Sequence, residues 1–261
     1  MQKIAIVTGG TSGIGLETVR ALEKAGVKTY ALSRHAAGDV EHIVCDVSDE
    51  ASVRLAVSEV VRRAGHVDIL VNCAGYGISG AAEYTDPADA RRQIDVNLFG
   101  ADRMIRAALP VMRAKGGGRV VCVSSVAAVA PIPFQAWYSA SKAGLNALTM
   151  ALRNELKPLG VSVCAVMPGD VKTGFTAARV KSEAGDDVYG GRVARSVSKM
   201  EHDEQTGMSA AAAGQKIAAI ALKRHVRPYY ALGLSYKACC ALIKLLPART
   251  ACWVIGKLYA S

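Results

Sequence analysis

The sequence is short of the residues that build metal sites and disulfide frameworks. It contains no CxxC pair, and its histidines are scattered, at His35, His42, His66, His202 and His225. The seven cysteines are odd in number and lie mostly in apolar runs, so neither disulfides nor a zinc site is expected. The N-terminal segment MQKIAIVTGG has too short an apolar run for a signal peptide. A reducing, cytoplasmic location without a metal is expected.

Carboxylate side chains are missing from the last part of the chain, where none follows Glu204. The same stretch carries eight of the basic residues behind the net charge of +10, namely Lys216, Lys223, Arg224, Arg227, Lys237, Lys244, Arg249 and Lys257. A basic excess can indicate nucleic acid, anionic lipid or a phosphate-bearing ligand. Here the basic residues do not cluster with stacking aromatics or follow a recognition-helix pattern, so no nucleic-acid partner is expected.

Short β-branched runs alternate with amphipathic segments along most of the chain. Strands are predicted at 3–9, 27–33, 42–47, 68–75, 119–125 and 161–169. Most are apolar on both faces, as a parallel sheet covered on both sides requires. Helices are predicted at 15–25 and 48–64, the second with Ser48 as N-cap. Without linkers or repeats, this alternation predicts one doubly wound α/β domain over residues 1–261.

A glycine-rich turn follows the first strand. Residues 8–15 read TGGTSGIG, with the spacing TGxxxGxG rather than GxGxxG. Glycines at such a turn let the backbone approach a pyrophosphate, which binds at the N-terminus of the following helix. A tight structural turn is the alternative, but the position between a strand and a helix favours a nucleotide site.

The stretch AWYSASKAG at 136–144 places Tyr138 and Lys142 four residues apart. In a helix these side chains lie on one face within reach of each other. Taken alone, the pair is either catalytic or an ordinary tyrosine packed over a lysine stem.

Several further elements occur in a fixed order with these two. They are Asp46, NCAG at 72–75, Asn97, Ser125 thirteen residues before Tyr138, and PGDVKT at 168–173. With TGGTSGIG and the Y-x-x-x-K pair they resemble the short-chain dehydrogenase/reductase family over about residues 3–175. One departure is Cys73, where the family often has asparagine, and only a slightly altered turn is inferred from it. The resemblance implies a single Rossmann-like domain, with a doubly wound parallel sheet and helices on both faces, that binds NAD(P).

The resemblance also implies the catalytic roles. Tyr138 is the acid/base, Lys142 its partner, Ser125 orients the substrate, and Asn97 holds a proton-relay position. A free phenol has a pKa of about 10. A neighbouring ammonium and a positive nicotinamide are expected to lower the pKa of Tyr138 towards neutrality.

The cofactor site that the resemblance implies spans most of the matched region. It comprises Gly9, Thr11, Ser12, Gly13, Ile14, Gly15, Ser33, Arg34, Asp46, Val47, Asn72, Ala74, Gly75, Tyr138, Lys142, Pro168, Gly169, Val171 and Thr173. In the family an acid at the end of the second strand selects NAD, whereas this chain has Ser33 followed by Arg34. A guanidinium can bind a 2′-phosphate, so NADP(H) is favoured over NAD(H), unless Arg34 is simply solvated. Asp46 is expected at the adenine edge or, alternatively, as a helix cap, and Thr173 at the nicotinamide carboxamide.

The segment 176–204 is irregular and charged, and we expect it to form a substrate lid. The aromatic residues Phe134, Trp137, Phe175 and Tyr189 either line an apolar pocket or belong to the core. Few polar groups are expected near the site, which favours a hydrophobic substrate.

The segment 228–261 is an apolar, basic extension. Its P-x-Y-x-x-G stretch at Pro228–Gly233 and its L-L-P-x-R turn at Leu245–Arg249 are similar to the tail of the steroid- and retinol-acting branch. Lys244 and Pro247 interrupt the apolar run, so it does not span a membrane. It could lie on a membrane surface, cover the pocket or contact a neighbouring subunit.

The sequence thus predicts an NADP(H)-dependent oxidoreductase that interconverts a secondary alcohol and a ketone on a hydrophobic, steroid-like substrate. The alternative within enzymes is reduction of retinal or of a lipid carbonyl such as acyl-dihydroxyacetone phosphate. A non-catalytic NADP(H)-binding sensor or scaffold is the alternative of another class. Analogy with the family suggests a homo-oligomer, such as a homodimer.

Overall fold

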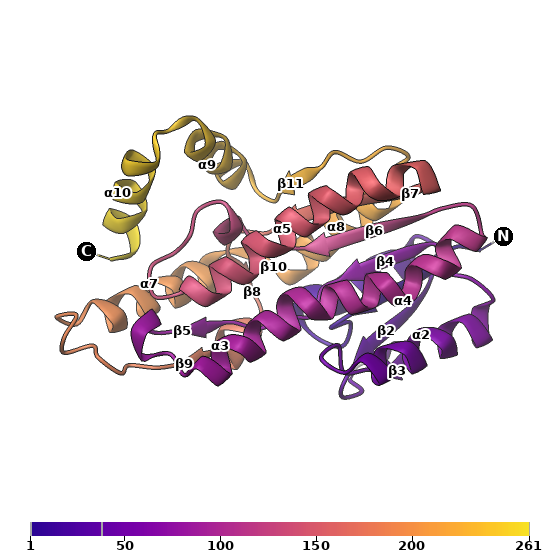
Figure 1. The fold of residues 1–261 in the computed structure, drawn as a ribbon, viewed down its shortest axis with the longest axis horizontal. Coiled ribbons are helices and arrows are strands. Elements are labelled where there is room, and N and C mark those ends of the chain that lie inside the picture. Colours follow the sequence, from indigo (N-terminus) through magenta and orange to yellow (C-terminus); the bar gives the residue numbers. More distant parts are fainter. Residues whose placement is uncertain (1, 38, 261) are drawn as a thin grey trace.

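The computed structural model describes residues 2–37 and 39–260. Its central sheet has seven parallel strands in the order β11-β7-β6-β4-β1-β2-β3 (Figure 1). The strands are β1 (Ile4–Thr8), β2 (Lys28–Ser33), β3 (His42–Val44), β4 (Ile69–Asn72), β6 (Gly118–Val123), β7 (Val161–Met167) and β11 (Tyr229–Ala231). The strand order reverses between β1 and β4, which makes the sheet doubly wound and confirms the predicted fold class.

Helices cover both faces of the sheet. One face carries α2 (Glu50–Ala64), α4 (Gly100–Ala114) and α5 (Ala136–Leu156), which lie in front in Figure 1. The other carries α1 (Gly13–Lys24) and α8 (Ala210–Leu222), which pack on each other and on the sheet. Because both faces are covered, every residue of β1 and β4 is buried, which explains their nearly continuous apolar sequence.

The other elements lie mostly around the carboxyl edge of the sheet, except one 3-10 helix, Lys157–Leu159, which leads into the amino end of β7. They are β5 (Ile78–Ser79), the 3-10 helix η1 (Ala82–Tyr84), α3 (Pro87–Ile94), the π-helix η2 (Asp95–Phe99), the 3-10 helices η3 (Val126–Ala128) and η4 (Lys157–Leu159), β8 (Val171–Lys172), α6 (Phe175–Ala178), β9 (Val180–Lys181), α7 (Arg192–Thr206) and β10 (Met208–Ser209). Two small parallel pairings, β5 with β9 and β8 with β10, attach the segment after β7 to the domain.

Three expectations need correction. The strand β11 was not predicted, because its three residues belong to a stretch that reads as a continuous apolar tail. The segment 176–204 is not irregular, since α7 accounts for much of it. Ser48 is not the N-cap of α2: Asp49 caps it, accepting hydrogen bonds from the Ala51 and Ser52 amides at 2.7 and 3.2 Å.

Two helices, α9 (Leu234–Leu245) and α10 (Ala248–Tyr259), form a C-terminal hairpin that stands at one end of the molecule (Figure 1). The break between them lies at Leu246 and Pro247. The inner side of the hairpin packs through Cys240 and Ile255 against Met167 and its neighbours. Among the described residues, no helix is long and apolar enough to cross a membrane.

Candidate active site

The carboxyl ends of β1, β4, β6 and β7 meet beneath the C-terminal hairpin and enclose a cavity of about 740 Å³. Parallel strands that end at one edge next to a reversal in strand order form the usual ligand crevice of this fold class. The predicted site residues that line the cavity are Gly9, Ser12, Gly13, Ile14, Gly15, Ala74, Gly75, Ser125, Tyr138, Lys142, Pro168, Gly169, Val171 and Thr173. The others, which lie outside this lining, are Thr11, Ser33, Arg34, Asp46, Val47, Asn72 and Asn97.

The turn after β1 is a cradle that only glycine can form. Gly9 and Gly13 have φ angles of 64° and 49°, in the left-handed region that favours glycine. At Gly15, an added Cβ would lie 2.1 Å from the carbonyl oxygen of Gly9, so α1 and the turn are in backbone contact. An added Cβ at Gly13 would lie 3.4 Å from Thr173, which places the loop after β7 opposite the turn.

The N-terminus of α1 opens into this cradle. Its N-cap residue, Ser12, has an extended backbone, and no side chain among the described residues caps the helix. The first turn also carries no acidic residue. Free amides at a helix N-terminus attract phosphate. The cradle and this helix end therefore fit the pyrophosphate of a dinucleotide.

Thr8, which the sequence analysis did not single out, fastens β1 to the turn after β4. Its hydroxyl oxygen accepts hydrogen bonds from the amides of Cys73 and Ala74, each at 3.0 Å. The neighbouring Asn72 is buried and donates to the carbonyl of Ala101 at 3.3 Å. Thr8 is the first residue of the TGxxxGxG motif, but the motif itself gives no role to its hydroxyl.

The residues expected at the adenosine end gather around the ends of β2 and β3. The Ser33 hydroxyl accepts from the Thr11 hydroxyl at 2.9 Å and donates to the carbonyl of His35 at 2.6 Å. Arg34 is exposed beside them. Burial raises the pKa of Asp46, but hydrogen bonds from Ser48 and the charge of Arg34 outweigh it, so the pKa is lowered overall.

Asp46 also has a local structural role. Its Oδ1 accepts from the Ser48 amide at 2.9 Å and from the Ser48 hydroxyl at 2.6 Å, forming the turn that enters α2. The helix-cap alternative for Asp46 is wrong, because Asp49 is the N-cap. Val47 is buried against Gly100, where an added Cβ would meet its side chain at 2.8 Å.

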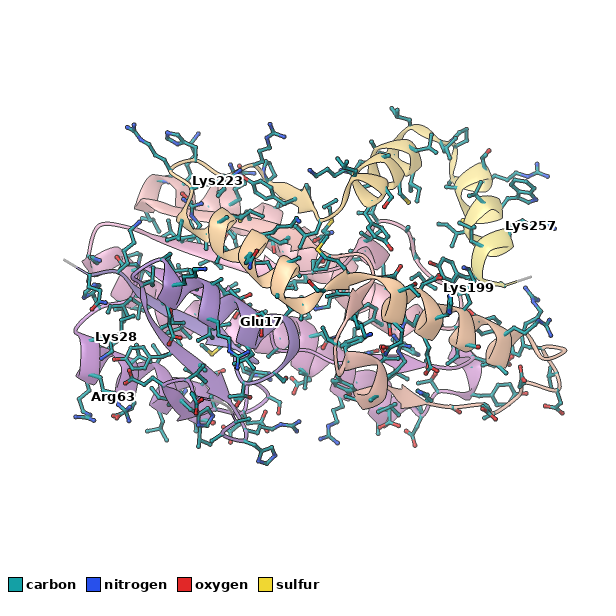
Figure 2. All side chains as sticks on the ribbon, turned by 180° about the vertical axis from the view of Figure 1, so that it is seen from behind. Glu17, Lys28, Arg63, Lys199, Lys223 and Lys257 are labelled. Atoms are coloured by element: carbon teal, nitrogen blue, oxygen red, sulfur yellow. The ribbon has the colours of Figure 1, made fainter. Side chains whose placement is uncertain are left out.

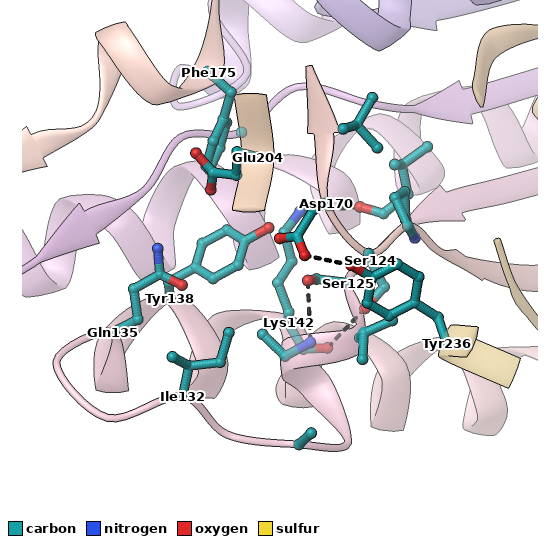
Figure 3. Close-up of a pocket in the computed structure, with 18 of the residues that line it drawn as sticks. Ser124, Ser125, Ile132, Gln135, Tyr138, Lys142, Asp170, Phe175, Glu204 and Tyr236 are labelled. Atoms are coloured by element: carbon teal, nitrogen blue, oxygen red, sulfur yellow. Dashed lines mark hydrogen bonds between the residues drawn. The ribbon is translucent and has the colours of Figure 1, made fainter. Parts of the chain in front are cut away.

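Tyr138 and Lys142 lie on the first turns of α5 and face the cavity (Figure 3). The Lys142 ammonium is buried, donates to the carbonyl of Val123 at 2.9 Å and lies 5.8 Å from the centre of the Tyr138 ring. Burial lowers the pKa of Lys142 to about 8. The Lys142 ammonium, in the lining of the cavity, therefore loses its proton more readily than an exposed lysine does.

The expected lowering of the Tyr138 pKa by Lys142 does not occur in this structure. Burial raises the pKa of Tyr138 to about 12, and a hydrogen bond with Ser125 opposes that rise. The Lys142 ammonium donates to the carbonyl of Val123 and lies 5.8 Å from the centre of the Tyr138 ring. The phenol is consequently a proton donor at neutral pH, and making it a base requires a further positive charge beside it.

Asn97 lies just behind this pair, in the π-helix η2, a distortion frequent at functional sites. Its amide nitrogen donates to the Tyr76 carbonyl and the Ser141 hydroxyl, both at 3.0 Å, and its oxygen accepts from the Tyr76 amide at 3.0 Å. At Gly75, an added Cβ would lie 3.0 Å from the Asn97 oxygen and 3.4 Å from the Lys142 ammonium. The two polar groups thus converge on one point.

Ser125 lies two residues after the end of β6 and lines the cavity. It is the N-cap of η3, and its hydroxyl oxygen accepts from the Ala127 amide at 3.1 Å. Figure 3 shows Ser125 on the same side of the cavity as Tyr138 and Lys142. The adjacent Ser124 is buried and donates to the Lys142 carbonyl at 3.2 Å, which holds β6 to α5.

The loop after β7 closes the cavity from below the hairpin. The Pro168 carbonyl accepts from the Val126 amide at 2.9 Å, and the Thr173 hydroxyl accepts from the Phe175 amide at 3.1 Å. At Gly169, an added Cβ would lie 2.3 Å from the Tyr236 ring, so this glycine seats the ring of a residue on α9.

A buried ion pair lies beside Tyr138 and was not predicted. Arg179, whose side chain is 0% exposed, is paired with Glu204, which also accepts from the Thr176 hydroxyl at 2.5 Å. Glu204, Gln135 and Asp170 all line the cavity. The expectation of few polar groups near the site is therefore wrong. The segment after β7 brings Arg179 and Glu204 back to the sheet edge.

The aromatic residues proposed for the pocket divide sharply. Phe175 lines the cavity and lies over Tyr138, with ring centres 5.7 Å apart. Phe134 and Tyr189 instead stack edge to face on each other at 5.5 Å, outside the cavity lining, and Trp137 is partly exposed. The aliphatic part of the wall comes from the C-terminal hairpin, through Leu242, Ile243, Leu246, Val254, Ile255 and Leu258. Segment 176–204 supplies Ala178 and Glu204, and its function as a lid stays a prediction.

Comparison with known proteins shows which family the chain resembles. Residues 3–184 match the short chain dehydrogenase family. The chain is 35% identical to the probable short-chain type dehydrogenase/reductase VdlC of Helicobacter pylori, over 94% of this chain and 93% of that protein. It is 36% identical to the 3-ketodihydrosphingosine reductase of Bacteroides thetaiotaomicron, over 85% of each chain.

A solved structure agrees with these relatives. A short-chain dehydrogenase from Streptomyces avermitilis superposes with a TM-score of 0.84 at 29% identity, covering 96% of this chain and 94% of that one. The family resemblance in the sequence is thereby confirmed, and the fold is one that binds NAD(P). The chain belongs to the short-chain dehydrogenase/reductase family and is an oxidoreductase.

Proposed function

We propose that the protein is an NADP(H)-dependent enzyme that interconverts a secondary alcohol and a ketone on a hydrophobic lipid substrate. The observation that carries the proposal is one cavity in which Tyr138, Ser125 and Lys142 meet an aliphatic wall from the C-terminal hairpin. A substrate with its carbonyl at the polar end would have its hydrocarbon part against Ile243 and Ile255.

In the reductive direction, a reduced nicotinamide coenzyme held in the cradle would supply the hydride for the carbonyl carbon and leave as the oxidised coenzyme. Tyr138 gives its phenolic proton to the carbonyl oxygen, and its raised pKa keeps that proton in place at neutral pH. The Ser125 hydroxyl donates a hydrogen bond to the same oxygen and stabilises its developing negative charge. The products are the alcohol and the tyrosinate of residue 138.

The tyrosinate then recovers its proton along the buried polar groups behind it. Lys142 lies one turn further along the same helix, and its lowered pKa makes it ready to give up a proton. Asn97 and the Lys142 ammonium both lie beside Gly75, and Asn97 would hold a water that returns the proton from solvent. In the oxidative direction each of these transfers is reversed.

The end of β2 supports the proposed preference for NADP(H). Position 33 is a serine whose hydroxyl is engaged by Thr11 and the His35 carbonyl, so no carboxylate there repels a 2′-phosphate. The neighbouring Arg34 is exposed and can approach that phosphate with its planar fork of donors.

An open-chain lipid ketone is the substrate that we place first. The hairpin lining is aliphatic and lies away from the sheet edge, as a long alkyl chain would require. The similarity to a 3-ketodihydrosphingosine reductase supports the same class. The hydroxysteroid that the sequence favoured becomes the second candidate, supported by Phe175 over Tyr138 as an apolar ring contact.

A substrate panel tests the proposal. Initial rates are measured by NADPH absorbance with 3-ketodihydrosphingosine, an acyl-dihydroxyacetone phosphate, retinal and several ketosteroids, each also with NADH. We expect turnover of a long-chain ketone with NADPH, and a loss of about 10²-fold to 10⁴-fold in kcat for Tyr138→Phe. Turnover confined to steroids would replace the lipid assignment. Unchanged NADPH binding without turnover of any ketone would favour the sensor or scaffold.

A further inference from the structure

The C-terminal hairpin has two apolar sides with different surroundings. Its inner side lines the cavity, whereas Leu234, Leu245 and Trp253 point to solvent and are 84%, 83% and 63% exposed. None of these three belongs to the cavity lining. All three belong to the C-terminal hairpin, and large exposed apolar side chains grouped on one structural unit mark an interaction surface.

The outward side of α9 has a regular pattern. Leu234 and Leu245 are separated by three helical turns and therefore share a face. Lys237 and Lys244 are separated by two turns, are exposed and border that face, with the Lys244 ammonium also 5.0 Å from the centre of the Tyr229 ring on β11. A leucine face bordered by lysines is typical of helices that lie in the plane of a membrane surface.

The charge of the hairpin has one sign only. It contains no carboxylate side chain and carries Lys237, Lys244, Arg249 and Lys257. Arg249 begins α10, next to the break that follows Leu245, and is exposed. Figure 2 shows Lys257 on the outer side of α10. Anionic lipid headgroups complement this charge, and leucine and tryptophan suit the layer just below them.

We propose that the C-terminal hairpin docks on an anionic lipid bilayer, with Leu234, Leu245 and Trp253 entering the headgroup layer. A second copy of this chain fits the surface poorly, because a symmetric pair would bring together two surfaces that carry cationic side chains and no carboxylate to pair with them. Each helix has 12 residues, so the hairpin lies on the bilayer and does not cross it.

Docking would place the cavity next to the lipid phase. Leu242 and Leu258 are both more than half exposed and line the cavity, so they connect its interior with the outer surface of the hairpin. A lipid substrate could move from the bilayer into the cavity without exposing its chain to water. This consequence rests on the proposed function, whereas the docking surface itself does not.

Vesicle co-sedimentation tests the docking. The full chain is mixed with phosphatidylcholine vesicles, with or without phosphatidylglycerol, at low and high salt. We expect binding to the anionic vesicles that weakens with salt, since charge attraction is screened. The variants Leu234→Gln/Leu245→Gln and Lys237→Glu/Lys244→Glu should each reduce the bound fraction about tenfold or more.

Matched variants at the far side of the molecule serve as controls. Leu55→Gln removes an exposed leucine, 72% exposed, from α2, and Lys216→Glu reverses an exposed lysine on α8. Both should bind vesicles as the wild type does, and NADPH affinity reports that each variant is folded. If the leucine variant does not fold, the lysine variant decides, because both of its changes are at exposed positions.

Three results would overturn the docking. They are no binding of the wild type to anionic vesicles, binding by both hairpin variants equal to the wild type, and self-association that the leucine variant abolishes without vesicle binding. In the last case a second copy covers the surface. Failure of the proposed function leaves a different trace, namely vesicle binding without turnover of any ketone.

Discussion

The hydroxyl of Tyr236, on α9, donates a hydrogen bond to the carboxylate of Asp170, in the loop after β7 (Figure 3). The ring of the same tyrosine rests on Gly169. Burial raises the pKa of Asp170, and the bond from Tyr236 opposes that rise. One residue thus ties the C-terminal hairpin to the loop expected to hold the nicotinamide.

Removing that hydroxyl should loosen the hairpin. For Tyr236→Phe we expect a loss of about 1–3 kcal/mol in the free energy of unfolding, because the partly buried Asp170 loses its partner. The KM for the ketone should rise, with a smaller loss of NADPH affinity, since the loop after β7 is loosened but the glycine cradle is not touched. Urea denaturation and steady-state kinetics measure both, with the half-exposed Tyr84→Phe as the control. Equal behaviour of the two variants would contradict the tie.

The buried ammonium of Lys142 should give the protein a pH-dependent stability. Burial lowers its pKa in the folded state from 10.5 to about 8, so between these values the unfolded chain binds more protons. This contribution to folding stability therefore increases as pH rises through that window, by at most roughly 3 kcal/mol.

The comparison of wild type with Lys142→Met isolates this effect. The free energy of unfolding of the wild type, minus that of the variant, should increase between pH 8 and pH 10.5. Urea denaturation across this range measures the difference, and groups that titrate in both proteins largely cancel. A difference that stays constant with pH would mean that the lysine is solvated.

Losing one member of the Arg179–Glu204 ion pair should cost more folding stability than replacing both. Glu204→Leu leaves a fully buried guanidinium without its carboxylate and should cost about 3–5 kcal/mol of folding stability. The double variant Arg179→Met/Glu204→Leu should recover most of that loss. Thermal and urea unfolding measure the three proteins. Glu59→Gln, which disrupts ion pairs with Arg62 and Arg63 on the surface of α2, should have little effect.

Coenzyme preference should change at the end of β2. Replacing Arg34 by Asp puts a carboxylate where the 2′-phosphate of NADP(H) is expected, so kcat/KM with NADPH should fall about tenfold or more, with a smaller change for NADH. Initial rates with both coenzymes give the ratio of kcat/KM for NADPH to kcat/KM for NADH. The matched change Arg91→Asp, at an exposed position of α3, should leave it unaltered. An unchanged ratio in the Arg34 variant would mean that this arginine is only solvated.

Local patterns in the sequence predicted the sheet edge well. The TGGTSGIG turn and the Tyr138–Lys142 pair are short-range features, whose backbone geometry follows from glycine spacing and helix periodicity. The six strands predicted from apolar runs are all present in the sheet, although β3 and β4 are shorter than expected. These features depend on neighbours in the sequence, which is why they could be predicted.

The outer wall of the cavity could not be predicted in the same way. Arg179 and Glu204 are 25 residues apart, and they meet only because α7 folds back over the loop after β7. Tyr236 and Asp170 are 66 residues apart. The direction of the Lys142 ammonium, on α5, depends on the carbonyl of Val123, at the end of β6. Contacts between distant segments have no periodic signal in the sequence.

The division of the cavity lining between an early sheet edge and a late hairpin has a consequence for how such enzymes can diverge. The proton-transfer groups and the glycine cradle all lie between residues 9 and 142, whereas α9 and α10 form one contiguous stretch near the end of the chain. Exchanging that stretch for the corresponding helices of a relative would give a chimaera with altered substrate choice and the original chemistry. Selection can therefore act on the two halves of the cavity separately.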